Sequence, residues 1–303
     1  MIGRAVGRDA STSDNGMTGA NDAASVVIVN YESGPALVGC VEGWRNEGPA
    51  RVVVVDNGST DGSTDEVSRR FPDVEILRPG CNLGYGAAAN RGVAATDTPW
   101  VVVGNPDLEV HAGALAILVG ALSADPGCAL AGPLIRTAEG ERYPSARQFP
   151  SLVDAAGHAV LGIFAPDNRF TRTYQKSHLD HAPAGTATTD WVSGACFVVR
   201  RDAFEQVGGF DEAYFMYAED VDLCWRLGRA GWRVAYVADA EVTHLQGVST
   251  DRHPYRMIAE HHRSLLRFAG RSTCGWRRLL LPLVALGIGF RALLALVARA
   301  TGR

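Results

Sequence analysis

Three carboxylates crowd into four positions of this chain's C-terminal half. Glu219, Asp220 and Asp222 lie at the start of a stretch, 221–230, whose pattern predicts a helix. Acidic side chains in a first helical turn interact favourably with the helix dipole, and this stabilisation of the helix is a purely structural explanation of the cluster. Aromatic residues precede the cluster, however, and an apolar wall beside clustered acids raises a carboxyl pKa, as general-base catalysis requires. The cluster is therefore a candidate site for removing a proton from a substrate.

Further polar residues stand where short apolar runs end. Asn30 and Asp56 each close a β-branched run that predicts a strand, and Asn105-Pro106-Asp107 follows another. Open α/β sheets bind ligands beside the carboxyl ends of their strands, so these positions favour a ligand site. Two explanations stay open for the segment 56–63. It is either a capped turn, or a nucleotide pocket in which Asp56 accepts from a base or ribose.

Asp107 is a candidate ligand for a divalent cation. A carboxylate held by a proline-stiffened turn suits Mg²⁺ or Mn²⁺, which prefer oxygen ligands and share their sites with substrate phosphates. His244 follows the apolar run 235–237 and is the candidate second ligand. The structural alternatives are an exposed Asp107 in a strand-to-helix turn and a histidine that serves only for packing.

The segment Gly84-Tyr85-Gly86-Ala87-Ala88-Ala89 matches the G-x-G-x-x-A pattern of dinucleotide-binding proteins. That pattern belongs directly after the first strand of its fold, whereas here it follows the third predicted strand. We interpret its glycines as allowing a helix N-terminus to approach a phosphate or neighbouring backbone. A dinucleotide-dependent oxidoreductase is kept as an alternative function.

The elements that must position these side chains alternate between strands and helices. Continuous apolar strands indicate a sheet that helices cover on both faces. The sequence therefore predicts an α/β fold with a doubly wound, mostly parallel sheet. Strands are expected at 25–30, 51–56, 74–77, 100–105, 191–199 and 233–237, and helices at 35–46, 63–71, 84–95, 201–207 and 221–230.

Three segments divide the chain. Residues 1–23 are rich in small polar residues and predict a disordered tail, whereas 24–250 form the α/β domain. Residues 251–303 predict C-terminal helices associated with a membrane. Within the domain, 137–190 is rich in proline, histidine and glycine, so we expect irregular structure that faces the substrate.

The apolar segment 279–298 carries one charge, Arg291, and arginines flank it on both sides. It is just long enough to span a bilayer, and an interfacial helix pair or a core helix explains it as well. The flanking arginines suit anionic lipid headgroups. Because the N-terminal residues lack an apolar run, we expect no secretory signal and place the protein on the cytoplasmic face of the cell membrane.

Composition argues against several classes of protein. The formal net charge is -4, so nothing in the overall balance suggests nucleic-acid binding. The six cysteines form no C-x-x-C pair, which argues against a zinc or redox site and favours reduced, structural thiols.

In their order along the chain, these motifs resemble those of the family 2 glycosyltransferases over about residues 25–249. The motifs are Asn30-Tyr31, 56–63, Asn82-Leu83-Gly84-Tyr85-Gly86, Asn105-Pro106-Asp107, 191–195, 208–212, 219–226 and His244. The resemblance implies the GT-A fold and inversion of the anomeric centre. Within the family, the motifs are similar to those of bacterial rhamnosyltransferases that act on polyprenyl-diphosphate-linked N-acetylglucosamine, the carrier of a cell-wall linker.

The resemblance also implies a role for each site residue. The roles are donor nucleotide binding (Asn30, Asp56, Asn82, Asn105), cation binding (Asp107, His244), proton removal (Asp220, with Glu219 as the alternative base) and acceptor binding (Trp191, Gly194, Ala195). Asn105 stands where most of the family has the first aspartate of Asp-x-Asp. More of the binding of Mg²⁺ or Mn²⁺ therefore falls on Asp107 and His244.

The implied reaction moves L-rhamnose from dTDP-β-L-rhamnose to N-acetylglucosaminyl-diphospho-polyprenol in an α-1,3 linkage. The expected partners are a nucleotide-sugar donor, a lipid-linked sugar acceptor and a membrane surface, with no nucleic acid. Two further alternatives remain. One is an enzyme of the same family that transfers galactofuranose, glucose or N-acetylglucosamine, and the other is a non-catalytic module that binds lipid-linked glycans.

Overall fold

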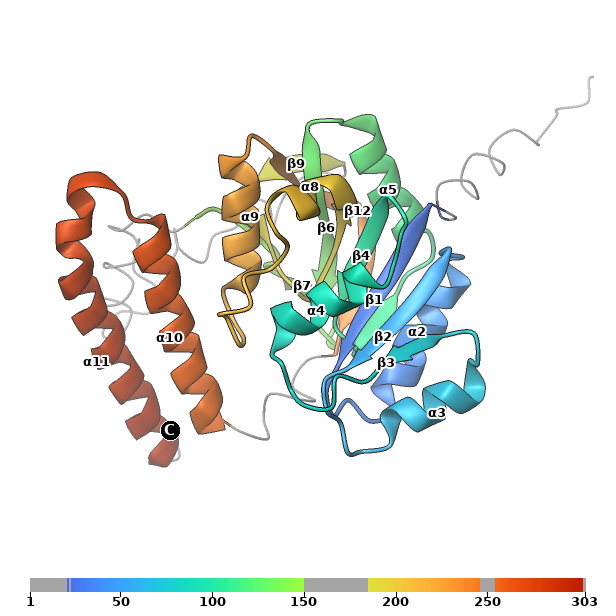
Figure 1. The fold of residues 1–303 in the computed structure, drawn as a ribbon, viewed down its shortest axis with the longest axis horizontal. Coiled ribbons are helices and arrows are strands. Elements are labelled where there is room, and N and C mark those ends of the chain that lie inside the picture. Colours follow the sequence, from blue (N-terminus) through green and yellow to red (C-terminus); the bar gives the residue numbers. More distant parts are fainter. Residues whose placement is uncertain (1–20, 22, 150–184, 246–253, 302–303) are drawn as a thin grey trace, which may run out of the picture.

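A computed structural model describes residues 21, 23–149, 185–245 and 254–301, and its α/β domain is built on one large mixed sheet (Figure 1). The predicted tail lies outside these residues except for 21 and 23, and so does the 150–184 part of the segment expected to be irregular. Helices lie on both sides of the sheet, and a pair of C-terminal helices stands to one side of it. The predicted α/β class is confirmed.

The N-terminal half of the sheet is parallel. Its strand order is β3-β2-β1-β4, and each predicted apolar run forms one of these strands. The predicted helices begin and end within two residues of the observed ones. The strands are β1 (Ala24–Asn30), β2 (Arg51–Asp56), β3 (Glu75–Leu77) and β4 (Trp100–Gly104), and the helices are α2 (Ala36–Asn46), α3 (Ser63–Arg70) and α4 (Tyr85–Ala94).

The C-terminal half of the sheet is mixed. Strand β11 runs antiparallel between β4 and β6, while β12 pairs with β6 in parallel and with β5 and β9 antiparallel. The elements are β5 (Leu108–Val110), α5 (Ala114–Ala124), β6 (Cys128–Arg136), β7 (Arg142–Tyr143), β8 (Ala146–Arg147), β9 (Thr186–Thr189), β10 (Trp191–Val192), β11 (Cys196–Arg200), α8 (Arg201–Gln206), α9 (Glu219–Arg229) and β12 (Arg233–His244). The predicted parallel pairing thus describes mainly the half that carries Asn30 and Asp56.

Alternation along the strands divides the core into two layers. On β1, Val26 and Ile28 pack with α2, α3 and α5, whereas Val27 and Val29 pack with α4, α8 and α9. All four side chains are buried. A continuous apolar run is needed here because each face of the strand meets a layer of helices.

One predicted strand is broken. The run 191–199 was expected to be continuous, but Ser193, Gly194 and Ala195 separate β10 from β11. Strand β10 pairs with β8 in a small sheet of its own. A Cβ atom on Gly194 would lie 3.2 Å from Cβ of Asp220, so the backbone of this break passes close to the acid, where a glycine fits best.

The C-terminal segment forms two helices, α10 (Pro254–Ser272) and α11 (Leu281–Ala300), joined through the short 3-10 helix η2 (Gly275–Leu280). Helices α10 and α11 lie side by side, and α10 also contacts α9 (Figure 1). No residue of α11 is buried among the described residues, so the interpretation of this segment as a core helix does not fit. In the described part of the chain, 275–300 is the one helical segment long and apolar enough to cross a membrane.

Candidate active site

The ends of β1 and β2 hold the first group of predicted residues. Asn30 and Asp56 are paired in register, and the Asn30 side-chain amide donates to Oδ1 of Asp56 at 3.4 Å. The same amide donates to the hydroxyls of Ser59 at 3.0 Å and Ser63 at 3.2 Å. The backbone N–H of Ser59 donates to Asp56 at 3.1 Å. This network fixes both side chains at the strand ends, where open sheets bind ligands.

Asn82 belongs to a second network. Its Oδ1 oxygen accepts the side-chain amide of Asn57 at 3.0 Å and the backbone N–H of Gly84 at 3.0 Å. Gly84 adopts a positive φ of 88°, and a Cβ atom there would collide with the backbone of Phe215. The first glycine of the pattern therefore allows the N-terminus of α4 to pack closely against the backbone of Phe215. This agrees with the interpretation from sequence.

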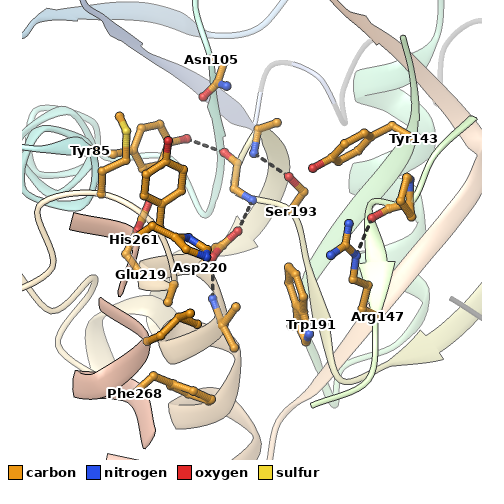
Figure 2. A pocket seen from close by; sticks show the side chains of 18 of the residues that line it. Tyr85, Asn105, Tyr143, Arg147, Trp191, Ser193, Glu219, Asp220, His261 and Phe268 are labelled. Carbon is orange, nitrogen blue, oxygen red and sulfur yellow. Dashed lines mark hydrogen bonds between the residues drawn. The ribbon is translucent and has the colours of Figure 1, made fainter. Parts of the chain in front are cut away.

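A cavity of about 400 Å³ lies where the segments after β4 and β10 meet the start of α9 and one face of α10 (Figure 2). Seven of the predicted site residues line it, namely Asn105, Trp191, Gly194, Ala195, Glu219, Asp220 and His244. The other four, Asn30, Asp56, Asn82 and Asp107, are not among its lining residues. Folding thus brings residues more than 100 positions apart in the sequence to one cavity.

Glu219 and Asp220 enter the cavity from the N-terminus of α9. Asp220 accepts two backbone hydrogen bonds, from Gly194 to Oδ2 and from Val221 to Oδ1, both at 2.8 Å. Glu219 is buried, and its Oε2 has no hydrogen-bond partner within the described residues. Burial and the negative charge of Asp220 raise the pKa of Glu219 to about 8, and burial raises the pKa of Asp220 as well. Because two N–H donors favour the charged form of Asp220, the proton of the pair resides on Glu219.

Asp222 has different surroundings from this acid pair. Its side chain is fully buried and accepts Nε of Arg226 at 2.6 Å, and Nε of Arg271 lies 3.4 Å away. The hydroxyl of Tyr214 donates to the same carboxylate at 3.4 Å. Asp222 does not line the cavity. Its geometry suits stabilisation of α9 and not proton transfer.

Asp107, Asn105 and His244 converge at the carboxyl end of β4. Nε2 of His244 lies 3.1 Å from Oδ1 of Asp107 and 3.0 Å from Nδ2 of Asn105. Adjacent ligands of an octahedral ion at about 2.1 Å stand about 3 Å apart, so the Asp107–His244 pair has the spacing of two such ligands. A 180° flip of the Asn105 side-chain amide would exchange its nitrogen and oxygen, which would place the oxygen beside Nε2 of His244.

These three side chains fit a divalent cation that also takes ligands from a diphosphate and water. Nδ1 of His244 is buried and has no hydrogen-bond partner within the described residues. Within the same part of the chain, no cluster of three His, Cys, Asp or Glu side chains has a geometry for a metal. A cation at this site would therefore take many of its ligands from the diphosphate of the bound donor and from water.

The predicted acceptor residues connect the parts of the cavity. Trp191 forms one wall, and the carbonyl of Gly194 accepts the hydroxyl of Tyr85 at 2.5 Å. The carbonyl of Ala195 accepts the backbone N–H of Asn105 at 2.9 Å. The segment 193–195 thus ties α4, β4 and the Asp220 carboxylate to one another.

Among the cavity residues that sequence reasoning missed are Tyr85, Arg147 and His261. Tyr85 was considered only as part of the glycine-rich pattern, Arg147 lies in the segment expected to be irregular, and His261 lies in the C-terminal helices. Burial lowers the pKa of His261 to about 4, so this ring is neutral near pH 7. No local pattern marks these residues, because only the pairing of β8 with β10 and the docking of α10 bring them to the cavity.

The chain matches the model of the family described as Glycosyl transferase family 2 over residues 25–208, which is more than half of its length. It also matches the model of Glycosyl transferase family group 2 over residues 147–301. The chain therefore belongs to glycosyl transferase family 2 and is a glycosyltransferase.

Two relatives from Mycobacterium tuberculosis are similar to it. The N-acetylglucosaminyl-diphospho-decaprenol L-rhamnosyltransferase is 45% identical over 272 residues, which cover 85% of this chain and 87% of that protein. The pre-mycofactocin glycosyltransferase is 35% identical over 196 residues, which cover 64% of this chain and 37% of that protein.

Solved structures share the fold. The mannosyltransferase PcManGT from Pyrobaculum calidifontis, in complex with GDP-Man and Mn²⁺, has a TM-score of 0.56 at 19% identity and covers 92% of this chain and 75% of its own. GalNAc-T7 with UDP, GalNAc and Mn²⁺ has a TM-score of 0.56 at 18% identity and covers 74% of this chain and 43% of its own. These likenesses confirm the predicted GT-A type of fold.

Proposed function

We propose that this enzyme transfers L-rhamnose from dTDP-β-L-rhamnose to N-acetylglucosaminyl-diphospho-polyprenol, with inversion and in an α-1,3 linkage. The observation that carries the proposal is the pair of buried acids, Glu219 and Asp220, in a cavity that also receives Asn105 and His244. The relative of 45% identity is named for rhamnosyl transfer to such a lipid-linked sugar, which supports this donor sugar and acceptor. The product would be a precursor of the cell-wall linker.

Asp220 is the general base in this mechanism. It takes the proton of the acceptor hydroxyl, whose oxygen attacks the anomeric carbon from the face opposite the leaving diphosphate. Its two backbone hydrogen bonds hold the carboxylate in one orientation. Glu219 keeps its proton and so avoids a second negative charge beside the nucleophile. Asn30, Asp56 and Asn82 bind the nucleotide.

Asp107 and His244, with Asn105, would hold Mg²⁺ or Mn²⁺ at the donor diphosphate. When bound, the cation neutralises the charge that develops on the leaving nucleoside diphosphate. Mn²⁺ accompanies the nucleotide in both structural neighbours, which supports a divalent cation here. The spacing of 3.1 Å between Asp107 and His244 is compatible with that role.

The C-terminal helices would hold the enzyme on the cytoplasmic face of the membrane. An apolar stripe runs along α11 at helical spacing, and its exposed members are Leu283, Leu286, Phe290, Leu293 and Val297. Arginines at both ends of the helix suit anionic headgroups. Because a polyprenyl acceptor resides in the same membrane, a membrane surface belongs to the proposal.

The test is incubation of the purified enzyme with dTDP-rhamnose and a prenyl-diphosphate N-acetylglucosamine, followed by mass spectrometry. We expect addition of one deoxyhexose, and its loss with EDTA and recovery with Mn²⁺. Parallel reactions with UDP-galactofuranose, UDP-glucose and UDP-N-acetylglucosamine test the other donors of the family. Turnover of one of these with none of dTDP-rhamnose would show that the proposed donor is wrong.

A further inference from the structure

Arg147 is the one arginine or lysine among the described residues that line the cavity. The other basic side chains there are His244, which meets Asp107, and His261, which is neutral near pH 7 because burial lowers its pKa. Arg147 is therefore the permanent positive charge in this part of the cavity. Figure 2 shows it with Trp191 across the cavity from Glu219 and Asp220.

Three contacts hold Arg147 in place. Its backbone is paired with Trp191 in the small sheet of β8 and β10, and its carbonyl accepts the hydroxyl of Thr189 at 2.9 Å. Its guanidinium lies over the Trp191 ring, 5.4 Å from the centroid, and Nε donates to the carbonyl of Pro144 at 3.0 Å. The guanidinium is thus oriented before any ligand binds, which lowers the entropy cost of binding.

The two terminal nitrogens of Arg147 remain available to a ligand. Neither makes a hydrogen bond or an ion pair within the described residues, and the bond to Pro144 uses Nε alone. The nearby carboxylate of Asp220 already accepts two backbone N–H groups. A planar pair of N–H donors facing a cavity matches the oxygens of a phosphate.

We propose that Arg147 binds the diphosphate of the lipid-linked acceptor, an inference that rests on the proposed function and adds a subsite to it. In the proposed function, the donor diphosphate is bound through the cation at Asp107 and His244. Arg147 lies elsewhere, in the β8–β10 sheet beside Trp191. The acceptor sugar then lies between Asp220, which takes the proton of its hydroxyl, and Arg147, which binds the diphosphate at its anomeric oxygen. The two terminal N–H donors of the Arg147 guanidinium therefore help to select acceptors that carry a diphosphate.

The kinetic test compares wild type, Arg147→Met and Arg147→Lys on two acceptors, prenyl-diphosphate N-acetylglucosamine and an alkyl N-acetylglucosaminide of similar chain length without phosphate. For Arg147→Met we expect the KM of the diphosphate acceptor to rise about 10-fold to 100-fold, as for loss of a bidentate, charge-assisted contact. The KM of dTDP-rhamnose and the kinetics with the neutral acceptor stay unchanged. Arg147→Lys keeps the charge but loses the planar pair of donors, so its KM for the diphosphate acceptor should lie between those of wild type and Arg147→Met.

Arg229→Met is the matched control, because Arg229 also stacks on a tryptophan, Trp225, at 5.3 Å but lies exposed outside the cavity. It should leave both KM values unchanged. A rise in the KM of dTDP-rhamnose with either acceptor would assign Arg147 to the donor diphosphate and overturn the proposal. Unchanged constants in Arg147→Met would overturn it as well.

Binding of farnesyl diphosphate, measured by calorimetry, separates this inference from the proposed function. We expect wild type to bind it and Arg147→Met to lose about 10-fold or more of that affinity, with unchanged affinity for thymidine diphosphate. Unchanged binding of thymidine diphosphate also shows that the variant is folded. If dTDP-rhamnose is not a donor but farnesyl diphosphate still requires Arg147, only the donor assignment fails. If wild type does not bind farnesyl diphosphate, the subsite is refuted.

Discussion

Glu219 and Asp220 are neighbours in sequence and differ by one methylene group, yet their carboxyl groups have different hydrogen-bond surroundings. Asp220 accepts two backbone N–H groups, whereas Oε2 of Glu219 has no partner among the described residues. Hydrogen bonds to a carboxylate favour its charged form, and burial without partners favours the neutral form. These surroundings favour the charged form of Asp220 and the neutral form of Glu219, which is the reason for proposing Asp220 as the base. Two expectations follow at the scale of these residues.

Asp220→Asn should lower kcat about 10²-fold to 10⁴-fold, because the amide cannot accept the acceptor proton. Glu219→Gln should keep most of the activity, since glutamine imitates the protonated acid. Initial rates of the two variants with saturating dTDP-rhamnose decide the matter. If the Glu219 variant were the inactive one, Glu219 would be the base, and retained turnover in the Asp220 variant would remove Asp220 from that role.

The raised pKa of Glu219 should appear in the pH dependence of stability. The folded protein binds this proton with a pKa of about 8, whereas the ordinary pKa of a glutamate side chain is 4.5. The stabilisation that comes from this proton is therefore complete below pH 4.5 and is lost as the pH rises through about 8. Glu219→Gln lacks this effect, so its stability relative to wild type should improve by about 2–4 kcal/mol between pH 5 and pH 8. Chemical denaturation at a series of pH values measures the difference, and a constant difference would show that the pKa is not raised.

At the scale of elements, α10 is attached to the segment that carries the acids. Arg271 pairs with Asp211 and lies 3.4 Å from the buried Asp222, and Arg267 pairs with Asp211 at 2.8 Å. The hydroxyl of Ser264 donates to the carbonyl of Met216 at 2.9 Å. Other residues of the same helix face the cavity. Helix α10 is thus a wall of the cavity as well as the neighbour of the apolar helix α11.

Arg271→Met should destabilise this attachment by about 1–3 kcal/mol, since it removes a partly exposed cation from a buried carboxylate that keeps Arg226 as its other partner. The free energy of unfolding measures the loss. Arg263→Met, at an exposed position of the same helix, is the control and should change stability by less than about 0.5 kcal/mol. Equal effects of the two substitutions would mean that the ion pairs of Arg271 contribute nothing.

At the scale of the whole molecule, the apolar stripe of α11 is at least half exposed at each of its members within the described residues. Leu286 and Phe290 are 73% and 59% exposed. Exposed apolar surface of this kind marks an interaction site, and a membrane is the partner that the proposed lipid-linked acceptor would require. The cavity and the stripe are connected through α10, which contacts both α9 and α11.

The double variant Leu286→Glu, Phe290→Glu should no longer sediment with vesicles of phosphatidylglycerol and phosphatidylcholine, whereas wild type sediments with them. Two charges in the apolar face oppose both burial in the acyl region and contact with anionic headgroups. Gly120→Glu, Ser123→Glu adds the same charge at exposed positions of α5 and should sediment like wild type. Equal loss of sedimentation in both variants would show that net charge alone controls binding.

The sequence by itself determined the parallel half of the sheet, because strands covered on both faces must be apolar at every position and end where the chain meets solvent. It also located Asn30, Asp56, Asp107 and the acids of α9, since their place at strand and helix ends is a local property. Only the tertiary structure decided which acid holds the proton, because the N–H donor of Gly194 comes from a distant loop. The same is true of Arg147 and α10, whose contribution to the cavity depends on pairing and docking between segments that no local pattern relates.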